Sequence, residues 1–137
     1  MKITGVVETA IHVDDVARSE EFYRRLFGFE KIAGDDHRFC AFAVPGSAVF
    51  LLFKKGGTLE PVPTPGGMIP PHDGDGHMHF AFKIPAESLA ACERELTEQG
   101  IAIESRVDWP RGGTSLYFRD PDDHLVELIT PGCWPVY

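Results

Sequence analysis

Hydrophobic and polar residues alternate with a period of two in several short segments of the chain, which is typical of strands. Between these segments, two stretches carry apolar residues at the spacing of a helix. Residues 6–13 are typical of a strand, and apolar residues at helical spacing follow from Val16 to Leu26. An aspartate directly before this segment provides the helix N-cap, and Gly28 provides its end. Three further strands are predicted at residues 29–33, 38–44 and 48–54.

The same order of elements returns in the second half of the chain. A strand is predicted at residues 77–84 and a helix at residues 86–99, which ends at Gly100. Leu89, Cys92 and Leu96 are expected on the buried face of this helix. The last three strands are predicted at residues 101–107, 114–119 and 124–130.

The segment between the two halves, residues 55–76, is crowded with glycine and proline. It has no periodicity, so we expect a connection or a lid without a regular element. The remaining chain then divides into a first βαβββ module at about residues 6–54, a second at about residues 77–130, and a tail at residues 131–137. The expected fold class is therefore α+β, a single domain with two tandem modules.

An internal repeat relates the two modules. Aligning Glu8 with His79 on the two first strands pairs Ala10 with Ala81, and a separate alignment of the two final strands pairs Leu51 with Glu127. Such self-similarity is typical of pseudo-two-fold folds, in which a site on the shared axis takes residues from both halves. On each strand, apolar residues alternate with the position of Glu8, His79 or Glu127 and point to the opposite face of the sheet. We expect the helices to pack on that apolar face, which leaves a polar inner face.

Three residues on that predicted inner face have metal-binding side chains, namely Glu8, His79 and Glu127. One imidazole and two carboxylates suit a divalent cation such as Mn²⁺, Fe²⁺, Zn²⁺ or Ni²⁺, with positions left open for water or substrate. The ordinary alternative is that these residues are surface or hydrogen-bonded side chains, as most strand histidines and glutamates are.

Four other residues are candidates for substrate contacts. His77 shares the face of His79, Trp109 could stack on a ligand, and Arg111 could bind a carboxylate or phosphate. Tyr117 lies on a strand of the second half. The alternative for Trp109 and Arg111 is a plain turn between strands.

Composition narrows the class of partner. The net charge of −8 disfavours binding to a phosphate backbone, so no nucleic-acid partner is expected. No segment approaches the roughly 20 apolar residues of a membrane helix, and the acidic residues near the start break any signal peptide. Three cysteines, an odd number with no C-x-x-C pair, argue against a disulfide framework and fit a reducing cytoplasm.

Three stretches carry a family resemblance, namely ETAIHVDDVARSEEFYRRLFGFE, GHMHFAF and SLYFRDPDDHLVELITPG. Together they resemble the vicinal-oxygen-chelate superfamily, which includes glyoxalase I, bleomycin-resistance proteins, extradiol dioxygenases and fosfomycin-resistance enzymes. The resemblance implies a cupped mixed β-sheet with helices outside, a small-molecule substrate and, often, a homodimer. It also implies that the family's metal ligands fall on Glu8, His79 and Glu127.

Two departures from the family pattern qualify this resemblance. Glyoxalase I commonly has a fourth ligand where this chain has Leu51, which cannot coordinate a metal. Fosfomycin enzymes and extradiol dioxygenases usually have histidine at the position of Glu8.

The resemblance implies glyoxalase-like lyase or isomerase chemistry, with Glu8 or Glu127 as the catalytic carboxylate that moves a proton. One alternative is an Fe²⁺-dependent ring-cleaving dioxygenase. A second alternative is a metal-free ligand-binding protein of the bleomycin-resistance type.

Overall fold

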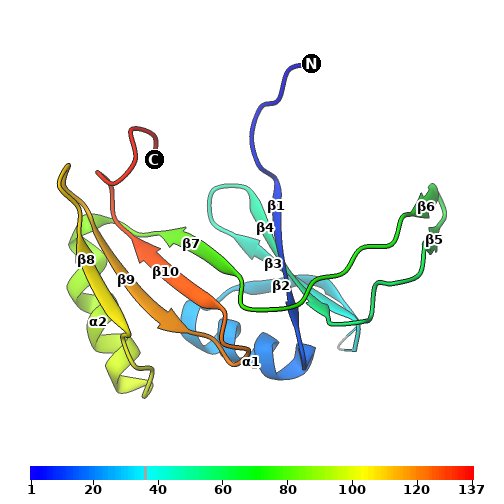
Figure 1. Cartoon of the computed structure of the whole chain (residues 1–137), viewed down its shortest axis with the longest axis horizontal. Coiled ribbons are helices and arrows are strands. Elements are labelled where there is room, and N and C mark those ends of the chain that lie inside the picture. The colour runs from blue at the N-terminus through cyan, green and yellow to red at the C-terminus, as the bar shows by residue number, and fades with distance from the viewer. Residues whose placement is uncertain (36) are drawn as a thin grey trace. The chain divides into compact units, whose positions relative to one another are not determined.

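The computed structural model describes residues 1–35 and 37–137, which form two compact units, Met1–Gly76 and His77–Tyr137. Each unit contains a four-stranded mixed sheet and a helix (Figure 1). The α+β class and the two βαβββ-like modules predicted from the sequence are confirmed.

The sheet of the N-terminal unit has the strand order β1-β4-β3-β2. Strand β1 pairs in parallel with β4, and the other two pairings are antiparallel. The parallel pair therefore lies at one edge, joined through the helix and the antiparallel strands. The strands are β1 (Glu8–Val13), β2 (Glu30–Gly34), β3 (Phe39–Val44) and β4 (Ala48–Lys54).

Helix α1 (Val16–Phe27) begins and ends where the sequence predicts. The Asp15 carboxylate accepts a hydrogen bond from the Arg18 amide at 3.0 Å, and Gly28 ends the helix in the left-handed conformation with φ 65°. The helix packs on one face of the sheet, where the Tyr23 ring meets the Phe50 ring edge-on at 5.0 Å. The opposite face of β1 and β4 is not covered by α1.

The sheet of the C-terminal unit repeats this topology with the order β7-β10-β9-β8. Strand β10 pairs in parallel with β7 and antiparallel with β9. The strands are β7 (His79–Lys83), β8 (Ser105–Asp108), β9 (Thr114–Arg119) and β10 (Leu125–Ile129).

The second helix is shorter than the sequence predicts. A 3₁₀ turn, η1 (Ala86–Ser88), precedes α2 (Leu89–Glu98), because the Ser88 amide bonds to the Pro85 carbonyl three residues back. Leu96 is fully buried, whereas Leu89 and Cys92 are half-buried. An ion pair between Glu93 and Arg106 joins α2 to β8.

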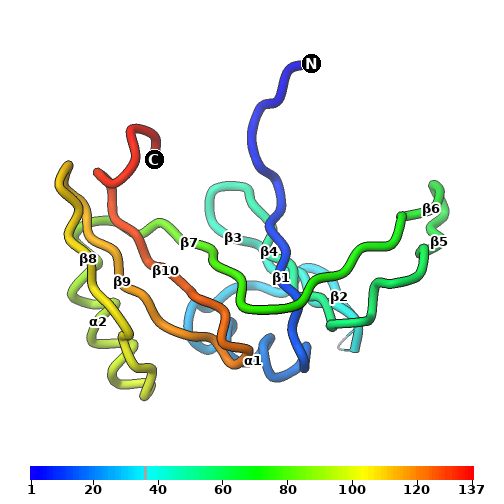
Figure 2. Tube along the Cα trace, in the orientation of Figure 1, coloured from blue at the N-terminus to red at the C-terminus, as the bar shows by residue number. Residues whose placement is uncertain are grey.

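The connection between the modules contains a small hairpin, which the sequence prediction missed. Strands β5 (Val62–Thr64) and β6 (Gly67–Ile69) pair antiparallel across a Pro-Gly turn (Figure 2). The Thr64 hydroxyl closes this turn by donating to the Gly67 carbonyl at 2.8 Å. The expectation of no regular element in this segment was therefore wrong, because strands of three residues are too short to show a periodicity.

The strand registers confirm the internal repeat. Ala10 pairs with Leu51 in the N-terminal sheet, and Ala81 pairs with Glu127 in the C-terminal sheet. The sequence alignment makes Ala10 equivalent to Ala81, so Leu51 and Glu127 occupy equivalent places.

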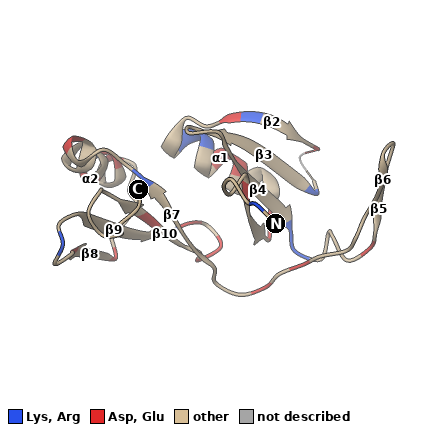
Figure 3. Ribbon diagram, turned by 90° about the horizontal axis from the view of Figure 1, so that it is seen from above, with Lys and Arg blue, Asp and Glu red and all other residues tan. Residues whose placement is uncertain are grey.

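Both helices are amphipathic, with apolar residues on the buried side and charged residues on the exposed side. Helix α1 carries basic and acidic residues together, as the blue and red segments of Figure 3 show. Within residues 1–35 and 37–137, no helix is long and apolar enough to cross a membrane.

Candidate metal centre

Glu127 is the centre of a polar cluster on the C-terminal sheet. It lies on β10, directly across from Tyr117 on β9 and beside the β7 strand that carries His79. The Tyr117 hydroxyl donates to Oε1 of Glu127 at 3.0 Å, and Nε2 of His79 lies 3.3 Å from Oε2. Since Glu127 is only 5% exposed, these two neighbours hold a carboxylate that water barely reaches.

The second nitrogen of His79 determines what Nε2 can do. Nδ1 lies 3.1 Å from the Leu125 carbonyl oxygen, which can only accept a hydrogen bond. Nδ1 therefore carries a proton, and Nε2 of the neutral ring presents a lone pair toward Oε2 of Glu127. Two acceptor atoms this close require a positive group between them, either a proton on Nε2 or a bound cation.

Tyr117 has an altered pKa in this cluster. Partial burial first, and then the hydrogen bond to the Glu127 carboxylate, raise the pKa of the Tyr117 phenol above its usual value. The hydroxyl therefore stays protonated and continues to donate to Glu127 throughout the neutral range.

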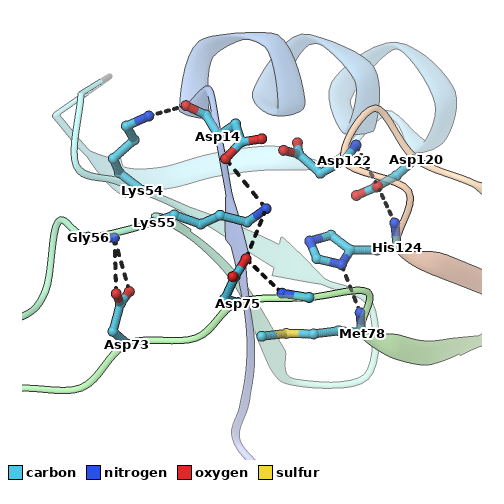
Figure 4. A network of polar contacts seen from close by, with 11 residues as sticks. Asp14, Lys54, Lys55, Gly56, Asp73, Asp75, Met78, Asp120, Asp122 and His124 are labelled. Atoms are coloured by element: carbon cyan, nitrogen blue, oxygen red, sulfur yellow. Dashed lines mark hydrogen bonds and ion pairs between the residues drawn. The ribbon is translucent and has the colours of Figure 1, made fainter.

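The start of β7 is fixed by a buried histidine. Nδ1 of His124 accepts a hydrogen bond from the Met78 amide at 2.9 Å, one residue before His79 (Figure 4). The turn before His124 is held by Asp120, whose Oδ1 accepts from the amides of Asp122 and His124. Asp120 therefore has a structural role in this aspartate-rich turn.

The other predicted substrate contacts lie in irregular segments around the sheet. His77 is exposed and lies just before β7. The Trp109 indole nitrogen donates to the Ser115 hydroxyl at 2.8 Å, which fixes the ring at the end of β8. Arg111 is exposed in the turn that the Gly112 amide closes onto the Trp109 carbonyl.

Glu8 lies in the N-terminal unit, at the first position of β1. It lines a cavity of about 460 Å³ together with side chains of β4 and of the connection after β4. Taking each unit by itself, no group of three or more His, Cys, Asp or Glu side chains is positioned to hold a metal ion among the described residues. The structure thus brings together two of the three predicted ligands, His79 and Glu127.

Sequence reasoning missed the cavity in the N-terminal unit. His72 lines this cavity, and its ring packs edge-on against the Phe53 ring at 4.7 Å. His12 is 6% exposed, and its Nε2 lies 3.7 Å from an Asp73 oxygen. No sequence signal could have found these contacts, because the connection that supplies them has no periodicity.

Comparison with known families gives one match across nearly the whole chain. Residues 5–128 match the model of the Glyoxalase/Bleomycin resistance protein/Dioxygenase superfamily. This range includes the three predicted ligands and both four-stranded sheets except the last residue of β10.

Individual relatives are distant in sequence and close in structure. The chain is 26% identical to the metallothiol transferase FosB of Bacillus licheniformis, covering 94% of this chain and 77% of the relative. It is 26% identical to the fosfomycin resistance protein FosX of Listeria innocua, covering 92% and 89%. The crystal structure of lactoylglutathione lyase from Agrobacterium tumefaciens superposes with a TM-score of 0.89 at 27% identity, covering 98% and 99%.

Proposed function

The chain belongs to the Glyoxalase/Bleomycin resistance protein/Dioxygenase superfamily, and from this premise we propose that it is a divalent-metal-dependent enzyme. Its substrate is a small molecule that presents neighbouring oxygen atoms to the metal. The reaction is of the lyase or isomerase type, as in glyoxalases.

Glu8, His79 and Glu127 are the proposed metal ligands. The observation that carries this proposal is the close approach of Nε2 of His79 to Oε2 of Glu127, 3.3 Å apart. An imidazole nitrogen and carboxylate oxygens fit Mn²⁺, Fe²⁺, Zn²⁺ or Ni²⁺. When bound, such an ion would act as a Lewis acid that polarises substrate oxygens.

The chain's own side chains would move the proton. A carboxylate, Glu8 or Glu127, takes a proton from a carbon beside a polarised carbonyl and returns it to the neighbouring position. The two carboxylates differ in how far their side chains can move, because Glu127 is buried and held by Tyr117 whereas Glu8 is exposed. This difference favours Glu8 as the mobile base and Glu127 as the fixed ligand.

The substrate contacts proposed from the sequence remain compatible with these roles. The Tyr117 hydroxyl is protonated and lies beside Glu127, where it can donate to a substrate oxygen as well. His77 and Arg111 are exposed and free to reorient, whereas Trp109 is held by Ser115 and offers a fixed ring for stacking.

A second candidate function is thiol addition to a small oxygen-rich compound. The observation that favours it is the similarity to the metallothiol transferase FosB along 94% of the chain. Leu51 supports it further, because this position lacks the carboxylate that glyoxalase I commonly adds.

The deciding experiment is elemental analysis of the purified protein before and after incubation with Mn²⁺, Fe²⁺, Zn²⁺ or Ni²⁺. We expect about one ion per chain, lost in the Glu8→Ala, His79→Ala, Glu127→Ala triple variant and retained in the control His37→Ala, whose side chain is exposed. Equal and negligible metal in all three proteins would reject the metalloenzyme and favour a metal-free binding protein. With metal present, oxygen uptake with catechols would indicate a dioxygenase, and consumption of fosfomycin with a thiol would indicate thiol transfer.

A further inference from the structure

The cavity in the N-terminal unit is built on the sheet face that α1 leaves uncovered. Its lining side chains come from β1, from β4, from Arg38 just before β3, and from the connection after β4. Ala10 and Leu51, which pair across the two strands, lie in the middle of one wall. Val62 and Ile69 of the β5–β6 hairpin contribute to another.

The strand register gives this cavity a direction. Glu8 lies at the start of β1, whereas Phe53 pairs with His12, four residues further along β1. Four residues of strand span roughly 13 Å. The far end is closed by the His72 ring, 4.7 Å from the Phe53 ring. A ligand oxygen near Glu8 would therefore leave room for an elongated body toward Phe53.

The lining suits a neutral, apolar body. Most of the lining side chains are apolar, and they are Ala10, Leu51, Phe53, Val62, Ile69 and Pro70. The charged lining residues are Glu8, Glu60 and Arg38, which leaves one unit of negative charge in excess. An anionic body would be repelled, and a strongly cationic one would have to displace Arg38.

Thr58 supplies a polar group at the far end. Thr58 is only 2% exposed, and its hydroxyl has no hydrogen-bond partner among the described residues. Its carbonyl accepts from the His72 amide at 2.9 Å, which places it beside the His72 and Phe53 rings. Because buried hydroxyl groups are normally hydrogen-bonded, this one points to a missing partner.

The cavity wall is held in place by contacts of the connection itself. The Gly56 amide donates to both oxygens of Asp73, and Lys55 pairs with Asp14 and Asp75 (Figure 4). These contacts tie both ends of the connection to each other and to the segment after β1. A ligand thus meets a wall that is already formed, which reduces the entropic cost of binding.

We propose that this cavity binds the body of the substrate, and that the substrate is an elongated molecule with three parts. Its chelating oxygens lie at the Glu8 end, an alkyl or aryl body extends along Ala10 and Leu51, and one hydroxyl or carbonyl group bonds to Thr58. Only the chelating end rests on the proposed function; the body and the polar end rest on the cavity.

The test uses the full chain treated with EDTA, so that no metal is needed. Binding of 4-propylphenol and of propylbenzene, which lacks the hydroxyl, is followed by chemical-shift changes in two-dimensional NMR. We expect saturable binding of both probes, with 4-propylphenol bound about fivefold more tightly because its hydroxyl pairs with Thr58. Thr58→Val should abolish this preference, whereas Thr9→Val, at an exposed position outside the cavity, should keep it.

Two filling variants, Leu51→Trp and Val62→Trp, place a large side chain in the cavity from different walls. Each should weaken the binding of both probes at least tenfold. The control Leu59→Trp changes a residue that is 61% exposed and should bind as the wild type does. Absence of saturable binding, or binding unchanged in both filling variants when their spectra show a folded protein, would overturn the proposal. If the probes bind as expected while elemental analysis finds no metal, the cavity stands and the metalloenzyme fails.

Discussion

The hydroxyl of Tyr117 donates a hydrogen bond to Oε1 of Glu127 at 3.0 Å, directly across β9 and β10. The other oxygen of the same carboxylate, Oε2, lies 3.3 Å from Nε2 of His79. Oε1 thus accepts a hydrogen bond from the neutral Tyr117 hydroxyl. Oε2 faces Nε2 of His79, which is an acceptor when the imidazole is neutral. This division leaves Oε2 as the oxygen that a cation would share with His79.

Tyr117→Phe should lower the free energy of unfolding by about 1–2 kcal/mol, because the Glu127 carboxylate loses the hydrogen bond from the phenol while the aromatic ring stays. Urea denaturation of Tyr117→Phe, Glu127→Gln and the double variant forms a cycle that isolates the pair. We expect a coupling free energy of about 1 kcal/mol. Strict additivity would show that the hydrogen bond contributes nothing to stability.

The raised pKa of Tyr117 predicts a loss of stability in alkaline solution. The folded protein keeps the phenol proton where the unfolded chain, with a tyrosine pKa of about 10, has released it. The free energy of unfolding therefore falls as the pH rises above about 10 and continues to fall until the pH reaches the folded-state pKa.

Urea denaturation between about pH 9 and pH 11.5 checks this expectation. The decline should be shallower in Tyr117→Phe than in the wild type. Burial also raises the pKa of Tyr137, so Tyr137→Phe should remove a separate part of the decline. Identical slopes in the wild type and Tyr117→Phe would contradict the assigned environment of Tyr117.

His124 should control both stability and the position of His79. His124→Phe keeps a ring of similar size but removes the acceptor for the Met78 amide, so unfolding should become easier by about 1–3 kcal/mol. His124→Asn restores an acceptor near the position of Nδ1 and should recover part of the loss.

Metal affinity gives a second measurement on the same variants. Met78 directly precedes His79, so His124→Phe should also weaken metal binding, and His124→Asn should weaken it less. Equal metal affinity in both variants and the wild type would show that the anchoring of Met78 does not position His79.

Most of the fold could be predicted from the sequence because its signals are local. The Asp15 cap and the Gly28 end define α1 by the chemistry of single residues. The repeat alignment placed Leu51 opposite Glu127, and the strand registers agree because side-chain alternation has a period of two in both sheets.

The cavity could not be predicted, for a physical reason. Its second wall is made by the β5–β6 hairpin and by Thr58 and His72, whose positions depend on contacts with residues far away in the sequence. The His72 backbone amide, for example, donates to the Thr58 carbonyl, and the His72 ring lies against Phe53 of β4. The candidate ligands, by contrast, lie at strand positions that alternation alone assigns to one face.

Leu51→Glu should tighten metal binding. Leu51 pairs with Ala10 as Glu127 pairs with Ala81, so a glutamate at this position lies on the same strand pair as Glu8 and adds a carboxylate to the ligand set. Titration of the EDTA-treated protein with Mn²⁺ should show an affinity gain of about tenfold, equal to about 1.4 kcal/mol.

The control for this variant is Leu59→Glu, which adds the same charge at an exposed position of the connection. A gain in Mn²⁺ affinity shared by both variants would come from the general attraction of a more acidic protein for cations, and it would contradict a fourth ligand at residue 51.

The carboxylate of Leu51→Glu also enters the apolar wall of the N-terminal cavity, where a charge is costly unless it is paired. Leu51→Glu should therefore bind propylbenzene more weakly while it binds Mn²⁺ more tightly, and unchanged propylbenzene binding would contradict the place of Leu51 in the cavity wall.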